Sequence, residues 1–314
     1  MKKILLLPVF TGLVCLFVSC KKAATDTAAV TAGTTVTDAA AKAISPAPAP
    51  LCSPGYYNLA LDPVTGNSLV YKISGSPSTG PVAVVPIIGT LGDNVVRVGG
   101  VPVTKMTGLA VDPASGTAWG ITSSGGSFPN HQIKFLIGNP NVATAIPIAP
   151  GCVGTLNLSD LERDPASGNY YAINSSAGVP ADNRIVRFIT GGAPTVVCLP
   201  NPVPLGTNLR GLTFDCGGTL FVAEMLGPNA RIYKADKVTG LLFTNCLYSG
   251  PVSPGGVGAP EMGLHFDCAC INKYITGDFR NQLLTDGGAP CLYAGAYAAA
   301  LPGTIKPTVD FARP

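Results

Sequence analysis

The sequence predicts an all-β protein, specifically a β-propeller built from four-stranded blades, and three observations support this prediction. One short phrase recurs at a nearly constant interval along the chain. Gly and Pro, the residues of turns, number 38 and 29 of the 314 residues. No segment of residues 51–314 shows sustained helical periodicity. Because repeats of roughly 20–50 residues are typical of propellers and solenoids, we expect each repeat to form one blade.

The recurring phrase is an apolar run that ends in Asp and is followed by turn residues. Its copies read NLALDPVTG, GLAVDPASG, DLERDPASG, GLTFDCGG and GLHFDCAC, with the aspartates Asp62, Asp112, Asp164, Asp215 and Asp267. Successive aspartates are 50, 52, 51 and 52 residues apart. An Asp side chain can accept a hydrogen bond from the backbone two residues on, Pro presets φ, and Gly supplies a positive φ. Each phrase therefore predicts a tight hairpin between two strands.

Two further strands are expected after each hairpin. Third strands are predicted at HQIKFLIG, NRIVRFIT and ARIYKAD, and fourth strands at ATAIPIA, PTVVCLP and LFTNCLYS. Four short antiparallel strands fit one propeller blade, and five such blades account for residues 51–314. Two alternatives stay open for the end of the chain: residues 296–314 form a sixth blade with residues near Leu51, or TIKPTVDF returns to close the ring beside the first blade.

Residues 1–19 have the pattern of an export signal. Lys2 and Lys3 precede an apolar stretch from Ile4 to Val18 that is too short for an ordinary transmembrane helix. The sequence LFVSC that follows, with KK after it, resembles the lipobox of Bacteroidetes-type bacterial lipoproteins. This resemblance implies that Cys20 carries the lipid, palmitate included, and becomes the first mature residue. The alternative is a plain secretory signal in which Cys20 is incidental.

Residues 20–50 are rich in Ala, Thr and Pro and nearly free of large apolar side chains, so we expect a flexible tether between the lipid anchor and the propeller of residues 51–314. The resemblance to lipoproteins places the protein in the bacterial cell envelope, at the outer membrane, either in the periplasm or exposed on the surface. Only 12% of the residues are charged and the formal net charge is +3. Because the sequence has no clustered positive charge, we expect no nucleic-acid partner.

Candidate binding residues follow from the architecture, because propellers usually bind at the mouth of the central channel, where the first strand of each blade begins. Positions shortly before the repeat aspartates supply a mixed set of charges and amides: Asn58, Lys105, Asp160, Asn208, Arg210 and Glu261.

The phrase NLRGLTFDCGGTLFVAEM resembles the strand–turn–strand unit of NHL and SMP-30-type six-bladed propellers. By that resemblance, Glu261, Asn208 and Asp160 would hold a divalent metal, and the protein would be a metal-dependent hydrolase or lactonase. The family's Asn normally stands directly before Gly-Leu, where this chain has Arg210. A cation beside a metal ion is unfavourable, so this departure argues against the metal.

Eight cysteines remain after Cys15 and Cys20 are set aside, an even number that predicts disulfides in an oxidising compartment. They are Cys52, Cys152, Cys198, Cys216, Cys246, Cys268, Cys270 and Cys291. Equivalent staples between neighbouring blades would pair Cys198 with Cys216 and Cys246 with Cys268. The same logic pairs Cys291 with Cys52 and leaves Cys152 with Cys270. A zinc site at His265, Cys268 and Cys270 is the alternative, but structural zinc sites prefer wider cysteine spacing.

No nucleophile elbow, zinc-protease motif, P-loop or EF-hand loop occurs in the sequence, and it contains only 2 His. We therefore expect a non-catalytic binding module, without a cofactor, for a protein, glycan or small molecule. The metal-dependent hydrolase is the first alternative, and a purely structural envelope protein is the second.

Overall fold

The computed structural model describes residues 56–74, 83–175, 182–189, 193–203, 208–226, 229–248, 264–266, 272–277, 280–285, 292–297 and 308–312. All of these residues belong to one compact unit, Pro48–Pro314. They form 22 β-strands and include no α-helix, which confirms the all-β prediction. Within these ranges, no helix is long and apolar enough to cross a membrane. The predicted signal, lipidated Cys20 and tether lie outside the described residues.

The described strands form five sheets, which we number as blades in chain order. Blade 1 has the order β22 (Thr308–Ala312), β1 (Tyr56–Leu61), β2 (Ser68–Ser74) and β3 (Ala83–Pro86). Blade 2 contains β6 (Met106–Asp112), β7 (Thr117–Thr122), β8 (His131–Leu136) and β9 (Asn139–Pro147), and is extended outward by β4 (Arg97–Val98) and β5 (Val101–Pro102).

Blades 3 to 5 each have four strands in chain order. Blade 3 consists of β10 (Leu158–Arg163), β11 (Tyr170–Asn174), β12 (Arg184–Ile189) and β13 (Thr195–Cys198). Blade 4 consists of β14 (Leu209–Phe214), β15 (Leu220–Leu226), β16 (Asn229–Ala235) and β17 (Leu242–Tyr248). Blade 5 consists of β18 (Leu264–Phe266), β19 (Asn272–Gly277), β20 (Arg280–Thr285) and β21 (Leu292–Tyr297).

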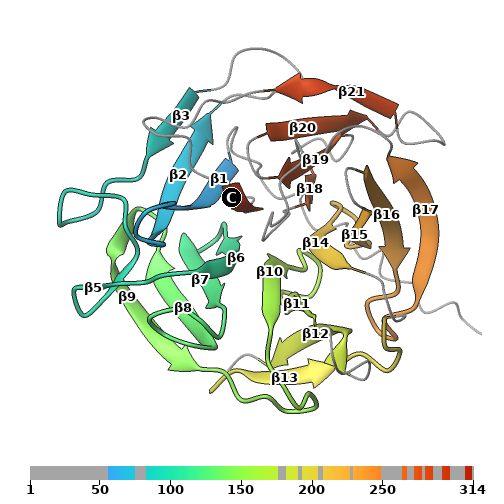
Figure 1. Ribbon diagram of the computed structural model, residues 1–314, viewed down its shortest axis with the longest axis horizontal. Helices are drawn as coiled ribbons and strands as arrows, with labels where there is room; N and C mark the ends of the chain where they lie inside the picture. Colours follow the sequence, from blue (N-terminus) through green and yellow to red (C-terminus); the bar gives the residue numbers. More distant parts are fainter. Residues whose placement is uncertain are drawn as a thin grey trace, which may run out of the picture. The chain divides into compact units, whose positions relative to one another are not determined.

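The innermost strands of the five blades form a closed ring (Figure 1). Around the ring, β22 contacts β6, then β10, β14 and β18 follow, and β18 contacts β22 again. The strand that closes the ring is β22, which pairs antiparallel with β1. This is the predicted return of the C-terminal segment to the first blade. Of the two alternatives for the chain's end, the described strands therefore match ring closure and not a sixth blade.

The predicted turn chemistry is present in the described hairpins. The Asp62 carboxylate accepts a hydrogen bond from the amide of Val64 at 2.9 Å, and Asp164 accepts one from the amide of Ala166 at 3.0 Å. The glycines that end these turns have positive φ values, 71° at Gly66 and 73° at Gly168. Only glycine adopts this region without steric cost, which explains its recurrence in the phrase.

The first copy of the phrase occupies a different place in its blade from the next three. The turns at Asp112, Asp164 and Asp215 join the first and second strands from the ring's centre. The turn at Asp62 joins β1 to β2, which are the second and third strands of blade 1, because β22 takes the innermost place. The regular spacing therefore does not imply equal positions, and the expectation that Asn58 begins an innermost strand is wrong.

The core lies between neighbouring blades. Successive strand residues face opposite sides of a sheet, so each blade presents one apolar face to the blade before it and another to the blade after it. The cluster between blades 3 and 4, for example, joins Tyr171 and Ile173 to Leu212 and Phe214. Trp119 of blade 2 packs on Tyr170 of blade 3 with ring centroids 5.7 Å apart, as expected of an inter-blade contact.

The observed disulfide joins Cys152 to Cys198, with Cα atoms 5.8 Å apart. The predicted pairing of Cys198 with Cys216, and with it that of Cys152 with Cys270, is therefore wrong. Cys152 lies on the connection from blade 2 to blade 3, which passes the outermost strand of blade 3, where Cys198 lies; a backbone bridge between Ala149 and Thr195 holds the two segments together. Cys216 is disulfide-bonded as well. Cys52, Cys268, Cys270 and Cys291 lie outside the described residues.

Candidate functional site

Two faces of the ring carry different loops. The residues directly before β6, β10 and β14, namely Lys105, Asn157 and Asn208, mark what we call the entry face. The turns at Asp112, Asp164 and Asp215 mark the opposite, hairpin face. In an antiparallel blade, the turns between second and third strands and the connections between blades lie on the entry face, together with the starts of the innermost strands.

The described channel-mouth candidates differ in how far they are exposed. Lys105 and Asn208 are exposed at the entry face, and Lys105 has a positive φ of 56°. Asn58 is fully buried in β1, and neither of its side-chain polar atoms has a hydrogen-bond partner within the described structure. Arg210 is partly buried in β14. Glu261 lies outside the described residues.

Asp160 connects two blades. Its side chain is 2% exposed, and its carboxylate accepts a hydrogen bond from the backbone amide of Leu212 in the next innermost strand. Thr107 makes the corresponding link from blade 2, because its hydroxyl donates to the carbonyl of Leu158 at 2.7 Å. Both residues lie at β-bulges, where an extra residue turns the side chain out of the regular alternation.

These contacts bear on the metal site that the SMP-30 resemblance implies. Asp160 holds blades 3 and 4 together, Asn208 is exposed, and Arg210 places a cation close by in sequence. Among the described residues, no group of three or more His, Cys, Asp and Glu side chains has a spacing that suits a metal ion. The described members of the trio therefore do not fit a metal centre, and no catalytic step is derived from one.

An open cavity of about 770 Å³ lies on the entry face between blades 2 and 3. Its walls come from the β7–β8 turn, the connection between the two blades and the end of β11. The polar lining consists of hydroxyls and amides, from Ser124, Asn130, Thr155, Asn157 and Ser175. The apolar lining comes from Pro129, Pro147, Ile148, Pro150 and Leu156. None of the described residues that line this cavity is charged.

A buried carboxylate holds one wall of the cavity in place. Asp182 is 5% exposed, and its two oxygens accept hydrogen bonds from the backbone amides of Gly154 at 3.0 Å and Thr155 at 2.9 Å. Asn174 adds a second anchor, because its side-chain oxygen accepts from the Asn157 amide at 2.8 Å and its side-chain nitrogen donates to the carbonyl of Asp182 at 2.7 Å. The wall is therefore held by groups that belong to blade 3.

Sequence reasoning did not identify this cavity. Its lining residues come from irregular loops that carry no motif, and Asp182 lies in a segment without a repeat equivalent. The only available signal was their location, because all of them flank the predicted first, second and third strands on the side of the predicted channel mouth. The residues chosen from that side were those nearest the ring axis, whereas the cavity lies between two blades.

Comparison with known proteins does not assign this chain to a family. No protein-family model matches the chain. No curated protein matches it either. Among solved structures, the chain is similar to a proposed 6-phosphogluconolactonase of Bacteroides uniformis, with 15% identity over 79% of this chain and 84% of that one, at a TM-score of 0.44. It is also similar to the calcium-binding protein regucalcin of Agrobacterium tumefaciens, with 14% identity over 64% and 76% of the two chains, at a TM-score of 0.38. Likeness at this level carries no functional assignment.

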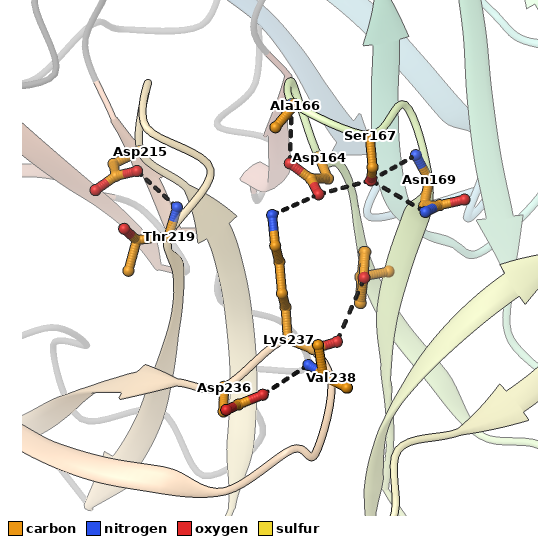
Figure 2. A network of polar contacts seen from close by, with 10 residues as sticks. Asp164, Ala166, Ser167, Asn169, Asp215, Thr219, Asp236, Lys237 and Val238 are labelled. Atoms are coloured by element: carbon orange, nitrogen blue, oxygen red, sulfur yellow. Dashed lines mark hydrogen bonds and ion pairs between the residues drawn. The ribbon is translucent and has the colours of Figure 1, made fainter. Parts of the chain in front are cut away.

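A second polar site occupies the hairpin face between blades 3 and 4 (Figure 2). The Asp164 carboxylate, fully buried, accepts hydrogen bonds from the Ser167 hydroxyl at 2.6 Å and from the Lys237 ammonium at 2.9 Å. Burial by itself raises the pKa of Asp164, but the hydrogen bonds from Ser167, Lys237 and the Ala166 amide outweigh this effect and lower the pKa below its ordinary value. Asp164 is therefore both the turn residue of blade 3 and the ion-pair partner of blade 4.

Proposed function

We propose that this protein is a lipid-anchored β-propeller of the bacterial cell envelope that binds a neutral glycan in the cavity between blades 2 and 3. The observation that carries the proposal is the cavity itself, with a volume in the range of small-ligand sites and a lining of hydroxyls, amides and apolar side chains without charge. The role is binding and not catalysis.

The chemistry of the lining suits a sugar. A pyranose ring has apolar C–H faces, which can pack on Pro147, Ile148 and Leu156, and a rim of hydroxyls, which can pair with Thr155 and Ser175. The side-chain oxygen of Asn130 in the same wall is buried and has no hydrogen-bond partner in the described part of the chain. A buried acceptor without a partner is costly, so a ligand hydroxyl that reached it would be favoured.

An envelope location agrees with the Cys152–Cys198 disulfide, because disulfides persist in exported proteins and are rare in the reducing cytosol. The lipid anchor on Cys20 rests on the sequence of the export signal.

Binding of neutral oligosaccharides tests the proposal. Thr155→Trp places a bulky side chain on an exposed position of the lining and should abolish saturable binding in calorimetry. Val142→Trp is the matched control, since Val142 is 64% exposed on β9 outside the cavity, and should leave binding unchanged. The proposal is wrong if no neutral saccharide binds the wild type, or if binding survives Thr155→Trp.

A further inference from the structure

A second cavity, of about 370 Å³, lies on the hairpin face between blades 3 and 4. One wall is the Asp164 turn and the outer strands of blade 3, and the other is the β16–β17 turn with Lys237 and Val238. It is separate from the uncharged cavity on the entry face between blades 2 and 3, which we call the neutral cavity. Its volume is in the range of sites for small ligands.

Among the described lining residues, Asp164 is the only carboxylate, and it is already neutralised. Asp164 accepts hydrogen bonds from the Ala166 amide, the Ser167 hydroxyl and the Lys237 ammonium. The neighbouring acid, Asp236, does not line the cavity, and its carboxylate accepts the amides of Val238 and Thr239 in its own turn. Asp164 and Lys237 therefore contribute no net charge to the cavity.

Arg187 adds a positive charge that is not balanced by any carboxylate in the described part of the chain. In blade 3 it stands between Tyr171 and Val197 in register, so these three side chains share one face of the sheet. Tyr171 packs on Phe214 of blade 4 with centroids 5.2 Å apart, which shows that this face looks toward blade 4 and the cavity. Among the described residues, no carboxylate lies within ion-pair distance of the Arg187 guanidinium.

Further hydrogen-bond donors lie near the Arg187 guanidinium. The cavity is also lined by Tyr171, Asn169 and Lys237. The described part of the lining carries two cations and one carboxylate, a net charge of +1 in a partly enclosed space. A guanidinium presents a planar fork of N–H groups that matches a carboxylate or phosphate with two parallel hydrogen bonds.

We propose that this cavity binds a small oxyanion, either a phosphate or a carboxylate group, with Arg187 as its principal ligand. Lys237, at the opposite wall, remains paired with Asp164. The site is independent of the neutral-glycan cavity, so either proposal can fail without the other.

The test is calorimetric titration of the purified full-length protein in low salt with inorganic phosphate and, separately, with acetate. Chloride at matched ionic strength controls for unspecific screening. Saturable binding of phosphate alone assigns a phosphate site, and binding of acetate assigns a carboxylate site. Arg187→Gln should weaken the binding at least tenfold. Lys234→Gln removes the same charge from an exposed position on β16 and should have no effect.

A second variant keeps the test decisive if Arg187→Gln does not fold. Val238 is 72% exposed and lines the cavity, so Val238→Asp is compatible with folding and places a negative charge at the rim. It should weaken anion binding several-fold through repulsion. The proposal is overturned if neither phosphate nor acetate binds the wild type saturably, or if binding persists unchanged in folded Arg187→Gln or in Val238→Asp.

Discussion

At the scale of single residues, Asp164 shows how one carboxylate serves two structural purposes. Within blade 3 it completes the hairpin by accepting the Ala166 amide and the Ser167 hydroxyl. Toward blade 4 it forms an ion pair with Lys237, whose side chain is 34% exposed while that of Asp164 is fully buried. Asp112 and Arg163 make a weaker version of this link from blade 2 to blade 3, at 3.7 Å.

Lys237→Met should lower the free energy of unfolding by about 2 kcal/mol at neutral pH, less than the roughly 3–5 kcal/mol for breaking a fully buried pair, because Lys237 is partly exposed to solvent. The pKa of Asp164 in the folded state is lowered, so its contribution to stability is present above the unfolded pKa of about 3.9 and is lost as the pH falls through the folded value.

Denaturant unfolding from pH 7 down to pH 3 measures this effect. The difference between the wild type and Lys237→Met should shrink in the acid range. Lys234→Met, at an exposed position of β16, is the control and should cost little at any pH. An equal loss in both variants, or a loss that does not change with pH, would contradict the role given to Asp164.

At the scale of elements, the close approach of two innermost strands restricts which residue can stand at one position. A Cβ atom at Gly108 of β6 would lie 2.5 Å from the backbone nitrogen of Leu161 and 2.6 Å from the carbonyl carbon of Asp160, both in β10. Backbone atoms cannot yield as a flexible side chain can. Glycine at this position therefore sets the spacing between blades 2 and 3, where the Thr107 hydroxyl also crosses.

Gly108→Ala should destabilise the protein by about 1–3 kcal/mol or more, the usual cost of overpacking a close contact. Gly138→Ala is the matched control, because a Cβ atom there would meet nothing within 4 Å. Thermal unfolding of the two variants compares them directly. A Gly108→Ala variant as stable as Gly138→Ala would show that the innermost strands can separate without cost.

At the scale of the whole molecule, segments far apart in sequence complete the ring. The pairing of β22 with β1 closes it, so blade 1 contains strands from both ends of the described chain. The Cys152–Cys198 disulfide fastens the connection between blades 2 and 3 to the outermost strand of blade 3. The disulfide restrains the connection that forms part of the wall of the neutral cavity, whereas the β22–β1 pairing restrains blade 1.

The proposed anchor gives a test on the whole protein in a bacterial host. Wild-type protein should incorporate an alkyne-labelled palmitate and partition into detergent, because the acyl chains are buried in the membrane. Cys20→Ala should lose both properties. Cys15→Ala, within the segment expected to be removed with the signal, should keep the label. A label that survives Cys20→Ala, or that is absent from the wild type, would contradict lipidation at Cys20.

Several features could be predicted from sequence because they depend on local chemistry. The Asp-Pro-x-Ser-Gly phrases determine their hairpins through hydrogen bonds between residues two or three positions apart and through a positive φ at glycine. The third and fourth strands of blades 2 to 4 lie where their apolar runs predicted them. The same phrase at Asp62 did not reveal that blade 1 is shifted by one strand, because that shift depends on β22, about 250 residues away.

By itself, then, the sequence determined the strand content, the turns and the propeller class, since each follows from contacts between near neighbours in the chain. Only the tertiary structure decided which cysteines meet, that Asp160 joins two blades, that Asp182 supports the wall of one cavity, and that Arg187 lines another. These outcomes depend on the close packing of neighbouring blades, which places residues about one repeat apart within hydrogen-bond distance of each other. No local pattern records which of those residues will point toward one another.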